Sequence, residues 1–210
     1  MESKLFTPVT FGPLTLRNRT IRSAAFESMC PGNAPSDMLL DYHRSVAAGG
    51  IGMTTVAYAA VTQSGLSFDR QLWMRPEIIP GLRRLTDAIH AEGAAAGIQL
   101  GHCGNMSHKS ICGCMPVGAS SGFNLYSPTF VRGLRADELP EMARAYGRSV
   151  NLAREAGFDS VEIHAGHGYL ISQFLSPSTN HRKDEFGGSL QNRMRFMDMV
   201  MEEVMKAAGW

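Results

Sequence analysis

The stretch Asp159-Ser-Val-Glu-Ile-His-Ala-Gly-His-Gly-Tyr169 contains the pattern on which the fold prediction rests. Its β-branched run, Val161 to Ile163, is typical of a strand buried on both faces, as in a parallel sheet. Three hydrogen-bonding side chains follow at once: His164, His167 and Tyr169. Because α/β folds carry their chemistry at the carboxyl ends of parallel strands, we expect a functional site at this point.

Outward from this stretch, strand and helix patterns alternate four times along the chain. Ser36 is a suitable N-cap for the first helix, and Gly49-Gly50 follows the end of that helix. Such alternation is typical of right-handed βαβ units with a parallel sheet. A dinucleotide-binding Rossmann domain is not favoured, since no Gly-x-Gly-x-x-Gly follows the first strand. The strands are predicted near 20–26, 51–61, 94–100 and 161–163, and the helices near 37–48, 77–92, 140–156 and 190–208.

The predicted fold class is α/β, with residues 1–210 as a single domain. Long segments after the strands favour a TIM-type (βα)8 barrel, of which this chain holds the first four βα units as a half-barrel. The longest of them, residues 101–135, is too polar and too rich in Gly and Pro to be core. Residues 5–19 indicate a small hairpin that caps the barrel. A methionine-rich stripe at helical spacing in the last helix is expected in the core; its residues are Met194, Met197, Met201, Val204 and Met205.

Composition limits the classes of function. A chain of 210 residues with 44% hydrophobic residues can form one domain with a large core. The net charge of +1 and the lack of a Lys/Arg cluster argue against a nucleic-acid partner. The N-terminus has no signal-peptide pattern and no apolar run reaches about 18 residues, so we expect a cytoplasmic protein without a membrane partner. The cysteines, expected as reduced thiols of which the last two form a loop pair without a special role, are Cys30, Cys103, Cys112 and Cys114.

Two imidazoles and a phenol form a particular chemical set. The imidazoles can donate to an oxygen that gains negative charge, and a phenol with a free pKa of about 10 is protonated at neutral pH. His164 and His167 could instead be metal ligands or structural histidines, although no Asp or Glu stands beside them. Tyr169 could be a half-buried aromatic residue, and Gln99 an ordinary polar strand end. His102 either faces the site or packs under the following loop, and the sequence leaves both places open.

Four motifs carry a resemblance to a known family. They are Asn-Arg-Thr-Ile-Arg-Ser-Ala-Ala-Phe at 18–26, Ile-Gln-Leu-Gly-His-Cys-Gly at 98–104, His-Ala-Gly-His-Gly-Tyr-Leu at 164–170 with Gln-Phe-Leu-Ser-Pro at 173–177, and Asn-His-Arg-Lys-Asp-Glu-Phe-Gly-Gly-Ser-Leu-Gln-Asn-Arg at 180–193. Together they resemble the old yellow enzyme family of FMN-dependent NADH:flavin oxidoreductases and ene-reductases, including its 2,4-dienoyl-CoA reductase-like branch. The resemblance covers nearly all of this chain but only the N-terminal half of the family's barrel.

The resemblance implies a bound FMN, NADH or NADPH as reductant, and reduction of the C=C bond of an enone, enal or enoyl thioester. Gln99 would contact the flavin, because an amide can donate to a carbonyl oxygen and accept from a ring N–H. His164 and His167 would hold the substrate's carbonyl oxygen, and Tyr169 would supply the proton. The other residues that would line the flavin are Ala24, Ala25, Phe26, Ala57 and Tyr58.

Two residues depart from the family's pattern, and other functions stay open. Phe26 stands where many members carry Thr or Cys, which could donate to the flavin, and Asn105 stands where an arginine often follows. One alternative is a metal-dependent barrel hydrolase or aldolase that uses His164 and His167. Another is a non-catalytic truncated fragment that only associates through its open sheet edges. Because a half-barrel exposes strand edges and apolar faces, we also expect self-association or pairing with a chain that supplies the second half-barrel.

We predict that the isolated 210-residue chain binds FMN weakly or not at all. The phosphate-binding loops that follow strands seven and eight of such a barrel have no counterpart in these residues. The visible absorption spectrum of the purified chain, with and without added FMN, tests this expectation. A yellow monomer with one FMN per chain would contradict it.

Overall fold

Residues 3–209 are described in the computed structural model, and they divide between two units. Buried apolar side chains occur in both. The prediction of one domain over residues 1–210 stays a prediction. The first unit comprises Met1–Ala59, Arg70–Gln99 and Leu152–Glu162, and the second comprises Ala60–Asp69, Leu100–Asn151 and Ile163–Trp210.

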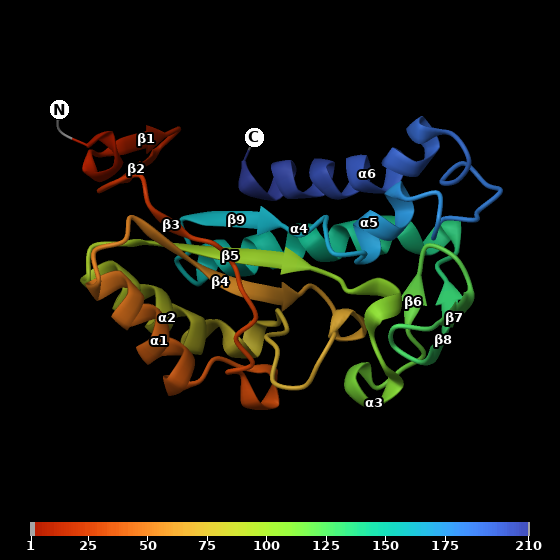
Figure 1. Ribbon diagram of the computed structural model, residues 1–210, viewed down its shortest axis with the longest axis horizontal. Helices are drawn as coiled ribbons and strands as arrows, with labels where there is room; N and C mark the ends of the chain where they lie inside the picture. The colour runs from red at the N-terminus through yellow and green to blue at the C-terminus, as the bar shows by residue number, and fades with distance from the viewer. Residues whose placement is uncertain (1–2, 210) are drawn as a thin grey trace. The chain divides into compact units, whose positions relative to one another are not determined.

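A four-stranded sheet belongs mostly to the first unit (Figure 1). Its strands lie in the order β3 (Ile21–Arg22), β4 (Met53–Ala60), β5 (Ala95–Gly101) and β9 (Ser160–Ile163). β3 and β4 pair in parallel, and the arrows of β4, β5 and β9 run in one direction in Figure 1. Every residue of β5 is buried, as expected for an inner strand of a parallel sheet. The predicted α/β class with a parallel sheet is therefore confirmed.

Two helices of the first unit, α1 (Asp37–Ala48) and α2 (Ile79–Ala91), pack against each other and agree with the predicted ranges. Ser36 caps α1, because its Oγ accepts a hydrogen bond from the N–H of Leu39 at 3.1 Å. α2 continues from a 3₁₀ turn and is followed by Gly93, whose φ of +76° favours glycine. Local signals thus mark the start of α1 and the end of α2.

A hairpin precedes the sheet, as predicted for this segment. β1 (Val9–Phe11) and β2 (Leu14–Leu16) pair in antiparallel fashion. Arg17 follows directly, and its guanidinium donates to main-chain oxygens at and just beyond the C-terminal ends of α1 and α2, where helix carbonyls lack intrahelical partners. The acceptors are the carbonyl oxygens of Ala47 at 2.5 Å, Glu92 at 2.7 Å and Ile51 at 2.9 Å.

A three-stranded sheet in the second unit lies within the segment predicted to be a non-core loop, residues 101–135. β8 pairs in parallel with β6 and in antiparallel fashion with β7. The prediction was wrong because strands of two to five residues are too short to show an alternating pattern. The strands are β6 (Val117–Gly118), β7 (Gly122–Asn124) and β8 (Thr129–Gly133), and the buried side chains of the segment include Cys112, Val117, Ala119, Val131 and Leu134.

Helices make up the rest of the second unit. The predicted helix near 140–156 corresponds to α4, and α5 was not predicted, because six residues give too short a helical pattern. α5 packs against α6. None of the helices within residues 3–209 combines the length and apolarity needed to span a bilayer. The helices are α3 (Lys109–Cys112), α4 (Leu139–Glu155, mostly in this unit), α5 (Leu170–Leu175) and α6 (Leu190–Ala208).

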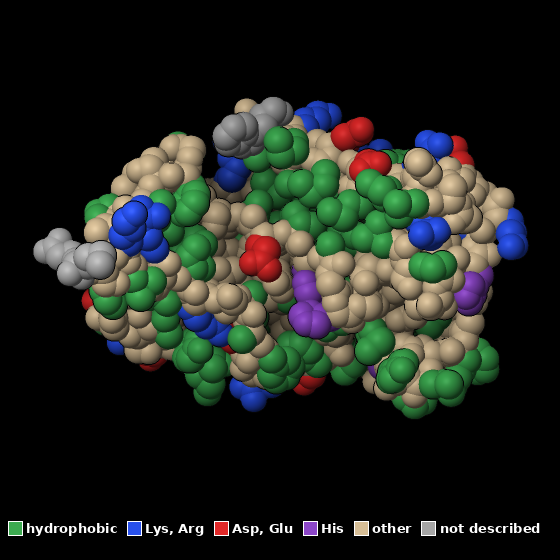
Figure 2. All heavy atoms as spheres, turned by 45° about the horizontal axis from the view of Figure 1, so that its top comes forward, with side chains coloured by type: hydrophobic (Ala, Val, Ile, Leu, Met, Phe, Trp, Pro, Cys, Tyr) green, Lys and Arg blue, Asp and Glu red, His purple; other side chains and the backbone are tan. Residues whose placement is uncertain are grey.

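Two predictions about burial were wrong. In α6 the buried residues are Phe196, Val200 and Val204, whereas Met194 and Met205 are 40% and 42% exposed. Figure 2 shows apolar side chains gathered on the surface of this helix. The side chains of β9 are also only half-buried or exposed, because β9 is the last strand in the sheet order and no described strand pairs with its outer edge. The predicted first strand, 20–26, is regular only at β3.

For the cap of α1, we predict that Ser36→Ala lowers the free energy of unfolding by about 0.5–2 kcal/mol. The substitution removes the acceptor for the Leu39 N–H and the hydrogen bond that Ser36 donates to the carbonyl oxygen of Met29. Urea unfolding followed by circular dichroism measures the change. Ser45→Ala is the matched control, because Ser45 is exposed on the same helix and only bonds back to Tyr42. Equal losses in both variants would contradict the capping role.

Candidate functional site

The turn after β9 brings the three predicted catalytic side chains together. The N–H of His164 donates to the carbonyl oxygen of Leu100 at 2.8 Å, which keeps the chain paired one residue beyond the strand. His167 then takes a left-handed backbone conformation with φ of +54°, which is uncommon for a residue other than glycine. Tyr169 precedes α5, and its N–H donates to the carbonyl oxygen of Gly166 at 3.1 Å.

The rings of the three residues form one cluster. Nδ1 of His167 and Nε2 of His164 are hydrogen-bonded at 3.0 Å, and the ring of Tyr169 meets that of His164 edge-on at 5.0 Å between centroids. His164 is buried, and His167 is exposed. One of these two nitrogens donates the hydrogen bond and the other accepts it. While this bond is present, Nδ1 of His167 and Nε2 of His164 therefore cannot both donate to a ligand. An acceptor oxygen that displaced the bond could receive hydrogen bonds from both.

Tyr169 is placed to keep its proton. Burial raises the pKa of its phenol above the ordinary value of 10.0, a hydrogen bond with Ser67 lowers it, and the charge of Cys103 raises it further. The net shift is upward, so the phenol is protonated at neutral pH and can act as a proton donor. Ser67 was missed in the sequence, because a serine in the loop after β4 carries no pattern that links it to a residue a hundred positions later.

His102 packs under the loop instead of facing the site, which decides between the two places that the sequence left open. Its side chain is fully buried. Nδ1 accepts from the N–H of Gly104 at 2.9 Å, so the proton lies on Nε2, which donates to Oγ of Ser64 at 3.1 Å. Burial lowers the pKa of this imidazole to about 3. His102 is therefore a neutral structural residue.

Gln99, in the first unit, is held in one orientation. Its Nε2 donates to Oε1 of Glu162 at 2.5 Å, and its side chain is almost completely buried. Among the described residues, none donates to its Oε1. The amide therefore keeps an acceptor and a second N–H, the pair of functions that a flavin edge requires.

The other predicted flavin-lining residues also lie in the first unit, after β3 and in β4. The main-chain groups of Ala24 and Ala25 have no hydrogen-bond partner within residues 3–209, and Phe26 is 74% exposed. These groups and Gln99 fit a ligand rich in donors and acceptors such as FMN. In contrast, the N–H of Ala57 already donates to Glu27 at 3.2 Å, and the carbonyl oxygen of Tyr58 accepts from Gln71, so those two residues could contact a flavin only through other atoms.

Glu27 is a further residue that the sequence did not single out. Its side chain is 5% exposed and accepts from Arg22 at 2.7 Å and from Nε2 of His43 at 3.0 Å, in addition to the N–H of Ala57. It joins the irregular segment after β3 to α1 and β4. The only signal in the sequence is an acidic residue beside the predicted end of the first strand.

A cavity of about 480 Å³ opens beside His167 in the second unit. Its walls are largely apolar and come from the β7–β8 hairpin and from the segment after β5. Within residues 3–209, no group of three or more His, Cys, Asp or Glu side chains could hold a metal ion. The lining residues include Met106, Phe123, Leu125, Tyr126, Gly168 and Thr179.

Known proteins match the chain over nearly its whole length. The model of the NADH:flavin oxidoreductase / NADH oxidase family matches residues 4–210. A 4,4'-dithiodibutanoate disulfide reductase from Rhodococcus erythropolis is 42% identical over 98% of this chain and 51% of its own length. An NADPH dehydrogenase from Bacillus subtilis is 37% identical over 97% of this chain and 60% of its own length. The chain thus spans between half and three fifths of these relatives.

Solved structures agree. An old yellow enzyme homologue from Zymomonas mobilis superposes with a TM-score of 0.91 at 30% identity, over 99% of this chain and 61% of the other. Morphinone reductase in complex with tetrahydroNAD gives a TM-score of 0.92 at 29% identity, over 99% of this chain and 62% of the other. The resemblance inferred from the four motifs is confirmed.

We predict that the buried, neutral His102 makes the free energy of unfolding decrease as the solution is acidified. Below about pH 6.5 the unfolded chain protonates this imidazole, whereas the folded chain does so only near pH 3, so folded-state stability falls as pH drops through that window. His102→Gln removes this titration. The stability advantage of the original chain over the variant should shrink by up to about 1.4 kcal/mol per pH unit below 6.5.

Urea unfolding of both chains between about pH 7 and pH 4 measures that difference. His181→Gln is the control, because it removes an exposed histidine and leaves the buried His102 in place. A constant difference between the original chain and His102→Gln over the window would contradict the prediction.

Proposed function

Because the chain belongs to the NADH:flavin oxidoreductase / NADH oxidase family, we propose that it is the N-terminal part of an FMN-dependent enzyme that reduces the C=C bond of α,β-unsaturated carbonyl compounds with NADH or NADPH. In this proposal its strands and helices are the first four βα units of a (βα)8 barrel, with the N-terminal hairpin as a cap. The observation that carries the proposal is the cluster of His164, His167 and Tyr169 at the end of β9.

The two histidines hold the carbonyl oxygen of the substrate. Reduction of the conjugated bond places negative charge on that oxygen, and a donor hydrogen bond is strongest where charge develops. The 3.0 Å bond between His164 and His167 keeps the two nitrogens side by side until the oxygen replaces it. Removal of one such donor typically lowers the rate by about 10²–10³.

Tyr169 gives its proton to the α-carbon of the substrate. Its raised pKa keeps the phenol protonated at neutral pH, and its ring contacts that of His164, so the donor lies next to the group that orients the carbonyl. General acid catalysis of this kind contributes about 10²–10⁴ in rate.

FMN, when bound, supplies the transfer of hydride. The residues that would hold it are Gln99, through its unengaged amide atoms, and Ala24, Ala25 and Phe26, through their main chain. Phe26 cannot donate a hydrogen bond to the flavin from its side chain, which leaves this contribution to the main chain.

The apolar cavity beside His167 would receive the part of the substrate that does not react. With about 480 Å³ and walls that include Phe123, Leu125 and Tyr126, it suits a hydrophobic ring or acyl chain. Binding there would position the conjugated carbonyl at the histidine pair.

The remainder of the barrel would come from another polypeptide segment or chain. The exposed Met194 and Met205 of α6, and the outer edge of β9, which has no described partner strand, fit such an association. If the purified 210-residue chain were a monomer with one bound FMN, this proposal would be contradicted. The metal-dependent alternative has no support from the described residues, which offer the histidine pair no third ligand.

We predict that Tyr169→Phe leaves reduction of the flavin by the nicotinamide cofactor intact and slows enone turnover by about 10²–10⁴. The experiment uses the FMN-loaded protein with the remainder of the barrel present and measures the two half-reactions separately by stopped-flow absorbance. The phenol is needed only where the substrate carbon is protonated, so only the second half-reaction should change.

Tyr42→Phe is the matched control, since it removes a phenol from α1, outside the cluster. It should leave both half-reactions unchanged. If Tyr169→Phe slowed flavin reduction and enone turnover equally, its assignment as proton donor would be lost.

A further inference from the structure

Two cysteines that the proposed chemistry does not use lie side by side in the second unit. Cys112 ends α3, and Gly113 follows in a left-handed conformation with φ of +73°, which turns the chain back at Cys114. The two Sγ atoms are 3.7 Å apart, and Sγ of Cys112 also lies 3.2 Å from the carbonyl oxygen of Cys114. Cys112 is buried and Cys114 is exposed, so a reagent can reach the pair from one side. The sequence had predicted a loop pair without a special role.

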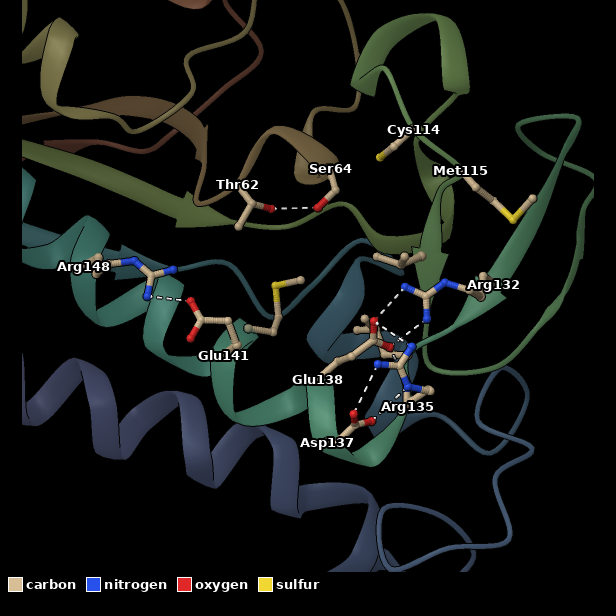
Figure 3. A pocket seen from close by; sticks show the side chains of 13 residues that line it. Thr62, Ser64, Cys114, Met115, Arg132, Arg135, Asp137, Glu138, Glu141 and Arg148 are labelled. Atoms are coloured by element: carbon tan, nitrogen blue, oxygen red, sulfur yellow. Dashed lines mark hydrogen bonds and ion pairs between the residues drawn. The ribbon is translucent and has the colours of Figure 1, made fainter.

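The pair stands at a cavity of about 640 Å³, to which Cys114 contributes (Figure 3). Three arginines and three carboxylates line this cavity, and they pair among themselves. The wall therefore carries no net charge and suits an uncharged ligand. Four apolar side chains, together with Thr62 and Ser64, line the rest of the cavity. The ion pairs are Arg132–Glu138, Arg135–Asp137 and Arg148–Glu141, and the apolar residues are Met115, Val117, Leu134 and Met142.

The distance between the two Sγ atoms limits which atom or ion both thiolates could bind at once. Two sulfurs bound at about 2.3 Å to one centre lie between about 3.3 Å and about 3.8 Å apart for bond angles from about 90° to about 109°, and the observed 3.7 Å falls in this range. A linear two-coordinate ion would need them much further apart, on opposite sides. A structural zinc needs four ligands, and no third His, Cys, Asp or Glu joins the pair in the part of the chain that the structure describes. A centre that needs only two thiolates therefore fits best.

We propose that Cys112 and Cys114 bind trivalent organoarsenic compounds, with the organic substituent in the adjoining cavity. Such arsenic forms three bonds, of which one goes to carbon, so two thiolates complete its shell. In the binding step, two As–S bonds form and two As–O bonds of the hydrated compound R–As(OH)₂ break. The two thiol protons leave with the hydroxides as two waters. Arsenic stays trivalent, so no oxidant or reductant is consumed.

Disulfide exchange at the same pair is disfavoured. Burial, the hydrogen bond with Cys112 and the charge of Cys112 raise the pKa of the Cys114 thiol to about 11. The thiolate form of Cys114, the exposed member of the pair, is then scarce at neutral pH, which disfavours attack on a disulfide by this residue. Arsenic binding differs, because the leaving hydroxide takes up the thiol proton.

The test uses the reduced chain and phenylarsine oxide, whose phenyl ring is the organic substituent. Intact-protein mass spectrometry and thiol titration should show one phenylarsenic group per chain, with two thiols lost. A small dithiol should reverse the binding, whereas an equal concentration of a monothiol should not. Cys114→Ser and Cys112→Ser should each weaken binding by about 10²–10⁴-fold, because one thiol loses the effective concentration of the other.

Cys30→Ser is the matched control, since Cys30 lies in the first unit and should not affect binding. Cys114 is exposed, so its replacement leaves the fold intact, which thermal unfolding by circular dichroism verifies. Binding of unchanged affinity in Cys114→Ser, or the loss of only one thiol per arsenic, would overturn the proposal.

Discussion

The left-handed backbone of His167 is the constraint on which the candidate site depends. A residue other than glycine in this conformation costs about 1–3 kcal/mol, and it persists only where its surroundings hold it. Gln173, which is 1% exposed, does so: its Nε2 donates to the carbonyl oxygen of Gly168 at 2.7 Å and to that of Cys103 at 3.1 Å. Its Oε1 accepts from the N–H of Asn105. An extended backbone at this point would turn the imidazole of His167 away from that of His164.

A buried carboxylate has the corresponding role in the first unit. Glu27 accepts from Arg22, His43 and the main chain of Ala57, so an irregular segment is tied to a helix and to a strand. Removal of one partner from such a buried network typically costs about 3–5 kcal/mol, because the remaining charge is left without compensation. Residues 24–25, which belong to no strand, lie between two members of this network, Arg22 and Glu27. This arrangement suits groups that must meet a rigid, flat ligand.

Prediction from sequence succeeded where the signal is local. α1 and α6 have the predicted bounds, because Ser36 lies directly before the helical pattern of α1 and the helical pattern of α6 is long. It failed for β6, β7 and β8 and for α5, since each is too short to show a period. It also failed for Met194 and Met205, because helical spacing shows that residues share a face but not what that face packs against.

By itself, the sequence determined the α/β class, the family, and that His164, His167 and Tyr169 follow one strand, since all three lie within six positions of its end. Only the tertiary structure decided which nitrogens of the histidines meet, that His102 is buried away from them, and that the thiols of Cys112 and Cys114 touch. These outcomes depend on a left-handed turn, on burial by distant segments and on side-chain rotation. The order of residues does not specify these three features directly. Burial and side-chain rotation result from contacts between distant parts of the chain, and several residue types can adopt the backbone angles of the turn.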